Sequence, residues 1–418
     1  MKRIILITVI FKLIVFQQIL FSQTVIGKFT FKTADQSKMT IPFKFISNLI
    51  IIPLQINNSD SLNFILDSGV RSAIISELTA SDSIQLNYVQ QVKLNGLGKG
   101  EPLDAYYSSG NIFRMKDIVG TNQNVYVLLE NIFSLSSRLG MRVHGLIGYD
   151  LFKNFVVEIN YTELTLTLYQ PAKYKYKNRK NRVTFPIEII EQKPYFQTEV
   201  TNNDGTTFLA KLLIDTGGSM GMWLAPLSNK KILMPEQTID MFLGIGLNGD
   251  ISGKLGRMKK FNIGKFQMTN LLVSFPDSQS VNNVIKLDKR NGSLGSEILR
   301  RFKVIIDYPG NKITFEPNSH LKDRFTYNVS GIEFTTPLPG LPIYEIYDIR
   351  KGSPAEIAGL RKGDQLNKIN SLKVFNYSID EIMLYFHGQK GKNLTISVMR
   401  DGQMIKTKLY LDDKLNVN

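Results

Sequence analysis

The sequence predicts a mainly β protein with two similar lobes in tandem, followed by a smaller α+β domain. Apolar and polar residues alternate in short runs between turn signals, and only short helical pieces interrupt them. A pattern of motifs in residues 26–172 returns in residues 173–318 and has stopped by about residue 331. We therefore expect a leader over 1–25, the two lobes, and a last domain over 319–418.

Residues 1–25 have the order of a secretory signal peptide. Lys2 and Arg3 precede the apolar stretch Ile4–Phe21, and small and polar residues follow it. Lys12 interrupts that stretch, which makes it a poor permanent membrane span, although an uncleaved anchor stays open as an alternative. We expect the chain to be exported, periplasmic or secreted, with no stable membrane span once the signal is removed.

Composition narrows the chemistry available to this chain. The 418 residues include no Cys and only three His, which are far apart in sequence. This excludes disulfides, thiol nucleophiles and Cys-ligated zinc, and it leaves little room for a Ser-His-Asp triad. We expect no metal and no cofactor, and carboxylates become the most plausible reactive groups.

The net charge of +15 would allow binding to polyanions or to an anionic membrane surface. Six cations lie between Lys173 and Arg182, with no acid among them. They suggest either a nucleic-acid or lipid patch or a solvated connector. No stacking aromatic platform or base-reading helix accompanies them, so we favour the connector and expect no nucleic-acid partner.

The internal repeat is defined by matched motifs at a constant offset. Asp67 and Asp215 are 148 positions apart, and Gly148 and Gly295 are 147 apart. A shift this constant over more than a hundred residues is unexpected for unrelated segments. We therefore interpret the two lobes as homologous.

Each repeat places an Asp where an apolar strand runs directly into a glycine turn. A carboxylate there is expected to be partly buried, which is costly unless it is hydrogen-bonded or shares a proton. A pseudo-twofold axis between the lobes would bring Asp67 and Asp215 face to face. Two close carboxylates share one proton, so one can activate a water while the other polarises a carbonyl.

These residues resemble the retropepsin-like and pepsin-like aspartic proteases. The resemblance covers both lobes and rests on Asp67-Ser68-Gly69, on Asp215-Thr216-Gly217, and on the apolar-Gly elements Leu146-Ile147-Gly148 and Ser293-Leu294-Gly295 about eighty residues later. It implies two aspartic-protease-like β-barrel lobes, with Asp67 and Asp215 as the catalytic dyad around a shared water. It also implies that Ser68 and Thr216 hydrogen-bond across the lobe interface, and that the chain is a monomeric pseudo-dimer.

The same family carries a β-hairpin flap over its cleft, and two segments are candidates for it. Residues 92–107 contain Gly98 and Gly100, and residues 241–255 contain Gly246. Glycine at the tip of a mobile hairpin suits a lid that closes over substrate.

The last hundred residues resemble a PDZ domain of the bacterial protease-associated type. The resemblance rests on a glycine-bounded helix and on the motif Gly363–Asn370. It implies that the loop with Gly340 and Leu341, and the strand that begins at Ile343, accept an extended peptide by β-augmentation. Pro342 departs from the usual loop because it lacks an N–H. A packing module that rigidifies the second lobe is the alternative.

We therefore expect an exported aspartic endopeptidase that acts on a protein or peptide substrate. Its PDZ-like domain would bind a peptide ligand or regulate access. A catalytically inactive peptide-binding or scaffold protein is the main alternative. A carbohydrate hydrolase with two carboxylates also fits a dyad, but it would not explain the twin turns or the last domain.

Overall fold

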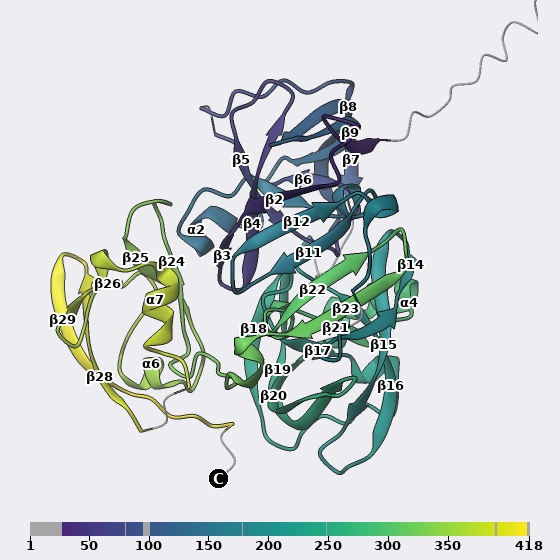
Figure 1. The fold of residues 1–418 in the computed structure, drawn as a ribbon. Coiled ribbons are helices and arrows are strands. Elements are labelled where there is room, and N and C mark those ends of the chain that lie inside the picture. The colour runs from purple at the N-terminus through teal and green to yellow at the C-terminus, as the bar shows by residue number, and fades with distance from the viewer. Residues whose placement is uncertain are drawn as a thin grey trace, which may run out of the picture.

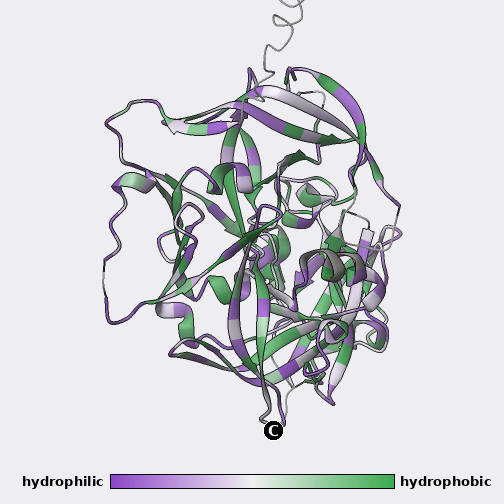
Figure 2. Cartoon of the chain, turned by 90° about the vertical axis from the view of Figure 1, so that its right-hand side faces the viewer, coloured by the Kyte–Doolittle hydropathy of each residue, from purple (hydrophilic) through white to green (hydrophobic). Residues whose placement is uncertain are grey.

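The computed structural model describes residues 27–415, except 80, 95–100, 178, 248 and 389–390. Within them the chain is mainly β, which confirms the fold class that the alternation predicts. Figure 1 shows two β-rich lobes and a smaller domain beside them. Hydrophobic residues form bands along the strands, and the outer loops are largely hydrophilic (Figure 2). In the described part, no helix is long and apolar enough to cross a membrane.

The first lobe is a closed β-barrel. Its elements are β1 (Lys28–Phe31), β3 (Lys44–Ile46), β4 (Leu49–Ile56), β5 (Leu62–Leu66), β6 (Ala73–Ile75), β7 (Val89–Leu94), β8 (Leu103–Met115), β9 (Ile118–Leu128), α2 (Leu135–Leu139), β10 (Gly145–Ile147) and α3 (Tyr149–Phe152). The strands β8, β4, β5, β10, β6 and β9 pair in this order. Because β9 also pairs with β8, they form a closed ring.

The second lobe repeats this barrel. Its elements are β14 (Glu188–Ile190), β15 (Lys193–Thr201), β16 (Thr207–Ile214), β17 (Met222–Leu224), η2 (Pro226–Ser228), β18 (Thr238–Gly246), β19 (Gly249–Ile263), β20 (Phe266–Pro276), α4 (Ser278–Asp288), β21 (Gly292–Leu294) and α5 (Ser296–Leu299). Here β19 pairs with both β15 and β20, so the ring through β16, β21 and β17 also closes.

A six-stranded sheet joins the lobes. It consists of β2 (Lys38–Pro42), β11 (Val156–Asn160) and β12 (Thr165–Tyr169) from one side of the repeat, and of β13 (Val183–Pro186), β22 (Phe302–Asp307) and β23 (Lys312–Pro317) from the other, with η1 (Pro171–Lys173) between them. At its centre β11 pairs with β22, and Glu158 lies opposite Ile305, the residue 147 positions later. The pseudo-twofold axis of the repeat therefore passes through this pair of strands.

The last domain has its own sheet, in the order β24-β25-β26-β28-β29. Its elements are η3 (Ser319–Lys322), β24 (Ile332–Thr335), β25 (Tyr344–Ile349), α6 (Pro354–Ile357), β26 (Gln365–Ile369), β27 (Leu372–Lys373), η4 (Val374–Asn376), α7 (Ile379–Leu384), β28 (Asn393–Arg400) and β29 (Gln403–Tyr410). A capping box at Ser378 and Glu381 begins α7.

Candidate active site

Two equivalent strands end at the two aspartates. β5 and β16 each end in three buried apolar residues, and each lies parallel to a short strand from later in its own lobe, β10 and β21. The backbone N–H of Asp67 donates to the Ile147 carbonyl at 2.8 Å, and that of Asp215 donates to the Leu294 carbonyl at 3.0 Å. The repeat therefore places both carboxyl groups at the same point of their respective barrels.

The glycines of the two turns are packed against these carboxyl groups. A Cβ on Gly217 would lie only 2.2 Å from the Asp67 carboxyl carbon, so this position must lack a side chain. A Cβ on Gly69 would lie 3.1 Å from Asp67 Oδ1 and 3.7 Å from Asp215 Oδ1. Oxygens of both aspartates thus converge on one point in the space between the turns.

Ser68 and Thr216 join the two turns by an exchange of hydrogen bonds. The Ser68 N–H donates to Thr216 Oγ1 at 3.0 Å, and the Thr216 N–H donates to Ser68 Oγ at 3.1 Å. Their hydroxyls donate in turn to the carbonyls of Ile214 and Leu66 on the opposite strands. Both side chains are buried, so these bonds form away from water and fix how the aspartates face each other.

Burial and mutual repulsion make the aspartates hard to ionise together. Burial, reinforced by the charge of Asp215, raises the pKa of Asp67 to about 7, although the Gly69 amide and Lys193 act in the opposite direction. Burial also raises the pKa of Asp215, against the charge of Arg290 and the backbone amides of the second turn. One proton is therefore retained between the pair well above the usual range for Asp.

Tyr308 is a neighbour of the site that sequence reasoning missed. Its hydroxyl donates to the Ser68 carbonyl at 3.4 Å, and its ring stacks on Phe152 with centroids 5.3 Å apart. Burial and the charge of Asp67 raise the pKa of this phenol, so it stays a hydrogen-bond donor. The signal was present in the sequence, because Tyr161 occupies the same place in the first repeat.

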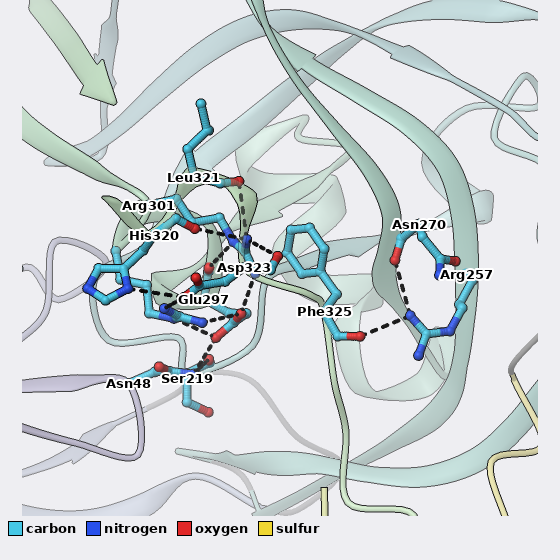
Figure 3. A network of polar contacts seen from close by, with 11 residues as sticks. Asn48, Ser219, Arg257, Asn270, Glu297, Arg301, His320, Leu321, Asp323 and Phe325 are labelled. Atoms are coloured by element: carbon cyan, nitrogen blue, oxygen red, sulfur yellow. Dashed lines mark hydrogen bonds and ion pairs between the residues drawn. The ribbon is translucent and has the colours of Figure 1, made fainter. Parts of the chain in front are cut away.

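A polar network ties the second Asp turn to the last domain (Figure 3). The Asn48 amide of the first lobe donates to the Ser219 carbonyl and to the Glu297 carboxylate, each at 3.1 Å. Glu297 also pairs with the fully buried Arg301 at 2.8 Å. Arg301 donates to the carbonyl of Asp323, at the start of the last domain. Nothing in the residue spacing indicated this network.

The two flap candidates have different outcomes. The hairpin β7–β8 is present, but Gly98 and Gly100 lie outside the described residues. In the hairpin β18–β19, Gly246 pairs with Gly249 and is buried.

The tip of β18–β19 reaches the first lobe. Ile245 and Leu247 pack on an apolar cluster that contains Ile74 and Leu128. A cavity of about 350 Å³ lies beside this tip, between Leu247 and Leu103. The hairpin therefore spans the two lobes, and its role as a lid stays a prediction.

The predicted peptide site at Gly340, Leu341 and Ile343 needs a correction. The strand that follows them, β25, is paired with β24 on one side and with β26 on the other, so it has no free edge for an added strand. The Gly340 N–H donates to the Gly140 carbonyl of the first lobe, and the Leu341 N–H donates to the Leu338 carbonyl. In the part of the sheet that the structure describes, the strand order ends at β24 on one side and at β29 on the other, and β24 is the edge strand next to β25.

Comparisons with known proteins agree with this architecture. Residues 52–151 match the family model described as aspartyl protease, and residues 322–411 match the model described as PDZ domain. The chain therefore carries an aspartyl protease domain with the Asp67 turn, and a C-terminal PDZ domain. Both resemblances that the sequence suggested are confirmed.

Among solved structures, the chain is similar to a photosystem II D1 C-terminal processing protease, with 21% identity and a TM-score of 0.20. That match covers 22% of this chain and 24% of the other. No curated protein matches the chain.

Proposed function

We propose that this chain is an exported aspartic endopeptidase that hydrolyses peptide bonds with Asp67 and Asp215. The observation that carries the proposal is the convergence of two carboxyl groups from equivalent turns of a duplicated fold. The raised pKa of each aspartate supports the single-proton state that this chemistry requires.

The reaction follows from that state. The ionised carboxylate takes a proton from a water, and the water oxygen adds to the peptide carbonyl carbon. The protonated partner gives its proton to the carbonyl oxygen, which forms a neutral tetrahedral intermediate. The C–N bond then breaks as the carboxyl that took the water proton passes it to the leaving nitrogen. The other carboxylate takes a proton from one hydroxyl of the intermediate, whose oxygen becomes the carbonyl of the new carboxylic acid, and the pair again holds one proton. No Cys or His takes part, which suits the composition of this chain.

The surrounding residues have positioning roles in this scheme. The Gly69 N–H holds Asp67 Oδ1 at 2.7 Å and so orients that carboxylate. Ser68 and Thr216 keep the two turns in register, because the hydroxyl of each bonds to the turn and strand of the other lobe. The PDZ domain supports a protein or peptide as the substrate or ligand. Export rests on the leader over 1–25, which lies outside the described residues.

The test is cleavage of a mixture of synthetic peptides by the purified chain from pH 3 to pH 8, with products identified by mass spectrometry. We expect Asp67→Asn and Asp215→Asn each to lower the rate about 10²–10⁴-fold. Asp35→Asn is the control, since Asp35 is exposed on the first lobe. Cleavage that survives both dyad substitutions would remove the dyad from the mechanism. No cleavage by the intact chain would favour the scaffold alternative.

A further inference from the structure

One face of the PDZ domain is formed by β24 and α7. The chain before β24 and the chain after α7 are joined by backbone bonds, with the Val329 N–H donating to the Phe386 carbonyl at 2.9 Å. The rings of Phe334 on β24 and of Phe386, just after the end of α7, lie 5.5 Å apart, so the strand packs against the chain that leaves the helix. PDZ domains take up extended peptides at an exposed sheet edge, and β24 is the edge strand beside α7, with β29 at the opposite edge.

This face is covered by α2 of the first lobe, which lies beside the PDZ domain in Figure 1. The Thr336 N–H, directly after β24, donates to the Ser137 carbonyl at 2.7 Å, and the Gly340 N–H donates to the Gly140 carbonyl at 3.0 Å. The last carbonyls of a helix have no partner inside the helix. The PDZ loop supplies these partners, so its donors are engaged by the chain itself.

Side-chain contacts extend this interface onto α7. A Cβ on Gly140 would lie 3.6 Å from Cγ2 of Ile379, so the turn after α2 sits closely on the start of α7. The backbone N–H and the hydroxyl of Ser47 both donate to the Asp380 carboxylate at 2.8 Å. The first lobe thus contacts the strand side and the helix side of the same PDZ face.

Arg138 connects this interface to the β18–β19 hairpin of the second lobe. Its guanidinium carbon lies 5.2 Å from the ring centroid of Tyr347 in the PDZ domain. It lies at the same distance from the ring of Phe242 on β18. Cation–π contacts of this kind stabilise both neighbours through one side chain. Loss of α2 from the PDZ face would therefore also release a contact that holds the hairpin.

We propose that the PDZ surface formed by β24, the loop 336–343 and α7 has a resident ligand, the segment Leu135–Gly140 of this chain. An external peptide occupies the surface only after this segment has left. Its departure also loosens the β18–β19 hairpin through Arg138. This inference concerns an intramolecular contact and does not depend on the proposed peptidase activity.

A disulfide trap in this cysteine-free chain tests the contact directly. A Cβ on Gly140 would lie 3.9 Å from the Cβ of Ile379, which is within the range of about 3.5–4.5 Å found in disulfides. We expect Gly140→Cys with Ile379→Cys to cross-link on mild oxidation, as seen by mass spectrometry. The control, Gly140→Cys with Leu384→Cys at the exposed other end of α7, should not. Equal cross-linking of the two pairs, or none in either, would overturn the proposal.

A release variant tests the competition without introducing cysteines. In Arg138→Ala with Asp380→Ala, we expect amide hydrogen exchange at Thr336 and Gly340 to be at least tenfold faster than in the wild type. Arg142→Ala is the control, because the side chain of Arg142 contacts Thr79, Ser81 and Asp82 within the first lobe. Exchange that is unchanged in the release variant would contradict the proposal.

Peptide binding is measured on the same proteins with a pool of synthetic decapeptides that have free C-termini. We expect the release variant to bind members of the pool at least tenfold more tightly than the wild type or Arg142→Ala. The oxidised Gly140→Cys/Ile379→Cys protein should bind none of them until it is reduced. Equal binding by all forms, or no binding by the release variant, would overturn the competition.

Discussion

Asn48 and Ser219 are in contact across the two lobes, at the positions where a hairpin tip of the first lobe meets the Asp turn of the second. The Asn48 side chain donates to the Ser219 carbonyl at 3.1 Å. The symmetry-related contact, between the Asp turn of the first lobe and a hairpin tip of the second, exists as well. Arg71, which is 148 positions before Ser219, forms an ion pair at 3.1 Å with Glu191 on the β14–β15 tip. Each Asp turn is therefore supported from the other lobe, once by a neutral hydrogen bond and once by an exposed ion pair.

The hydrogen bonds of the Asn48 side chain should contribute measurably to the unfolding free energy of the chain. Asn48→Gly removes the side chain but keeps a residue that tolerates the left-handed backbone at this position, where φ is 63°. Because the variant loses bonds to Ser219 and Glu297, we expect a loss of about 1–3 kcal/mol in urea unfolding. Asn311→Gly is the control, with φ 51° and an exposed side chain, and it should change stability by less than about 0.5 kcal/mol. Equal effects would show that the backbone, and not the contact, is responsible.

The bonds between Ser68 and Thr216 predict a second stability difference. Ser68→Ala leaves the Ile214 carbonyl and the Thr216 N–H without a buried partner. Unsatisfied buried groups cost about 1–3 kcal/mol each, so we expect a clear fall in the unfolding free energy. Thr216→Ser keeps the hydroxyl, so we expect it to lower the unfolding free energy less than Thr216→Ala does. Thermal and urea unfolding measure all three variants, and identical stabilities of the Ser and Ala variants at 216 would contradict this account.

The raised pKa of Asp67 predicts how stability depends on pH. Its pKa is about 7 in the folded chain and 3.8 ordinarily, so between about pH 4 and pH 7 the folded state holds a proton that the unfolded state has lost. The contribution of this group to the unfolding free energy is fully present below about pH 4. It falls as the pH rises from 4 to 7, and it is lost once the pH has passed 7. The unfolding free energy of Asp67→Asn should therefore fall less steeply with pH than that of the wild type. At pH 8 we expect it to be higher than the wild-type value by up to a few kcal/mol. Parallel curves of unfolding free energy against pH would contradict the raised pKa.

Gly148 predicts a strict requirement for glycine behind the first turn. A Cβ at this position would lie 1.9 Å from the Asp67 carbonyl oxygen, a backbone atom that cannot move aside without displacing the turn. We expect Gly148→Ala to cost at least about 3 kcal/mol, or to prevent folding. Gly221→Ala is the matched control, because its Cβ would meet its nearest neighbour at 3.5 Å. Circular dichroism and urea unfolding distinguish the two, and a Gly148→Ala chain of wild-type stability would refute the clash.

The features that could be predicted from the sequence are those that occur in both copies of the repeat. The paired Asp turns and the apolar-Gly elements could be found because duplication places the same residue types at a constant offset. The family models confirm the aspartyl protease and PDZ domains. Sequence reasoning failed at Gly340 and Leu341, because the motif says which strand follows a loop but not which strand is at the edge of the sheet. That depends on the order of strands, with β24 outside β25.

The sequence alone determined the duplicated architecture, the position of each Asp at the end of an apolar strand, and the presence of the last domain. These are properties of local patterns, and burial of alternating apolar residues reproduces them in each repeat. Only the tertiary structure decided that the Asp67 and Asp215 carboxyl groups converge and that α2 covers the PDZ edge. It also decided that Asn48, Glu297 and Arg301 link the second turn to the start of the PDZ domain. Such contacts join residues that are far apart in the chain, and they follow from how the folded lobes pack, which no local pattern specifies.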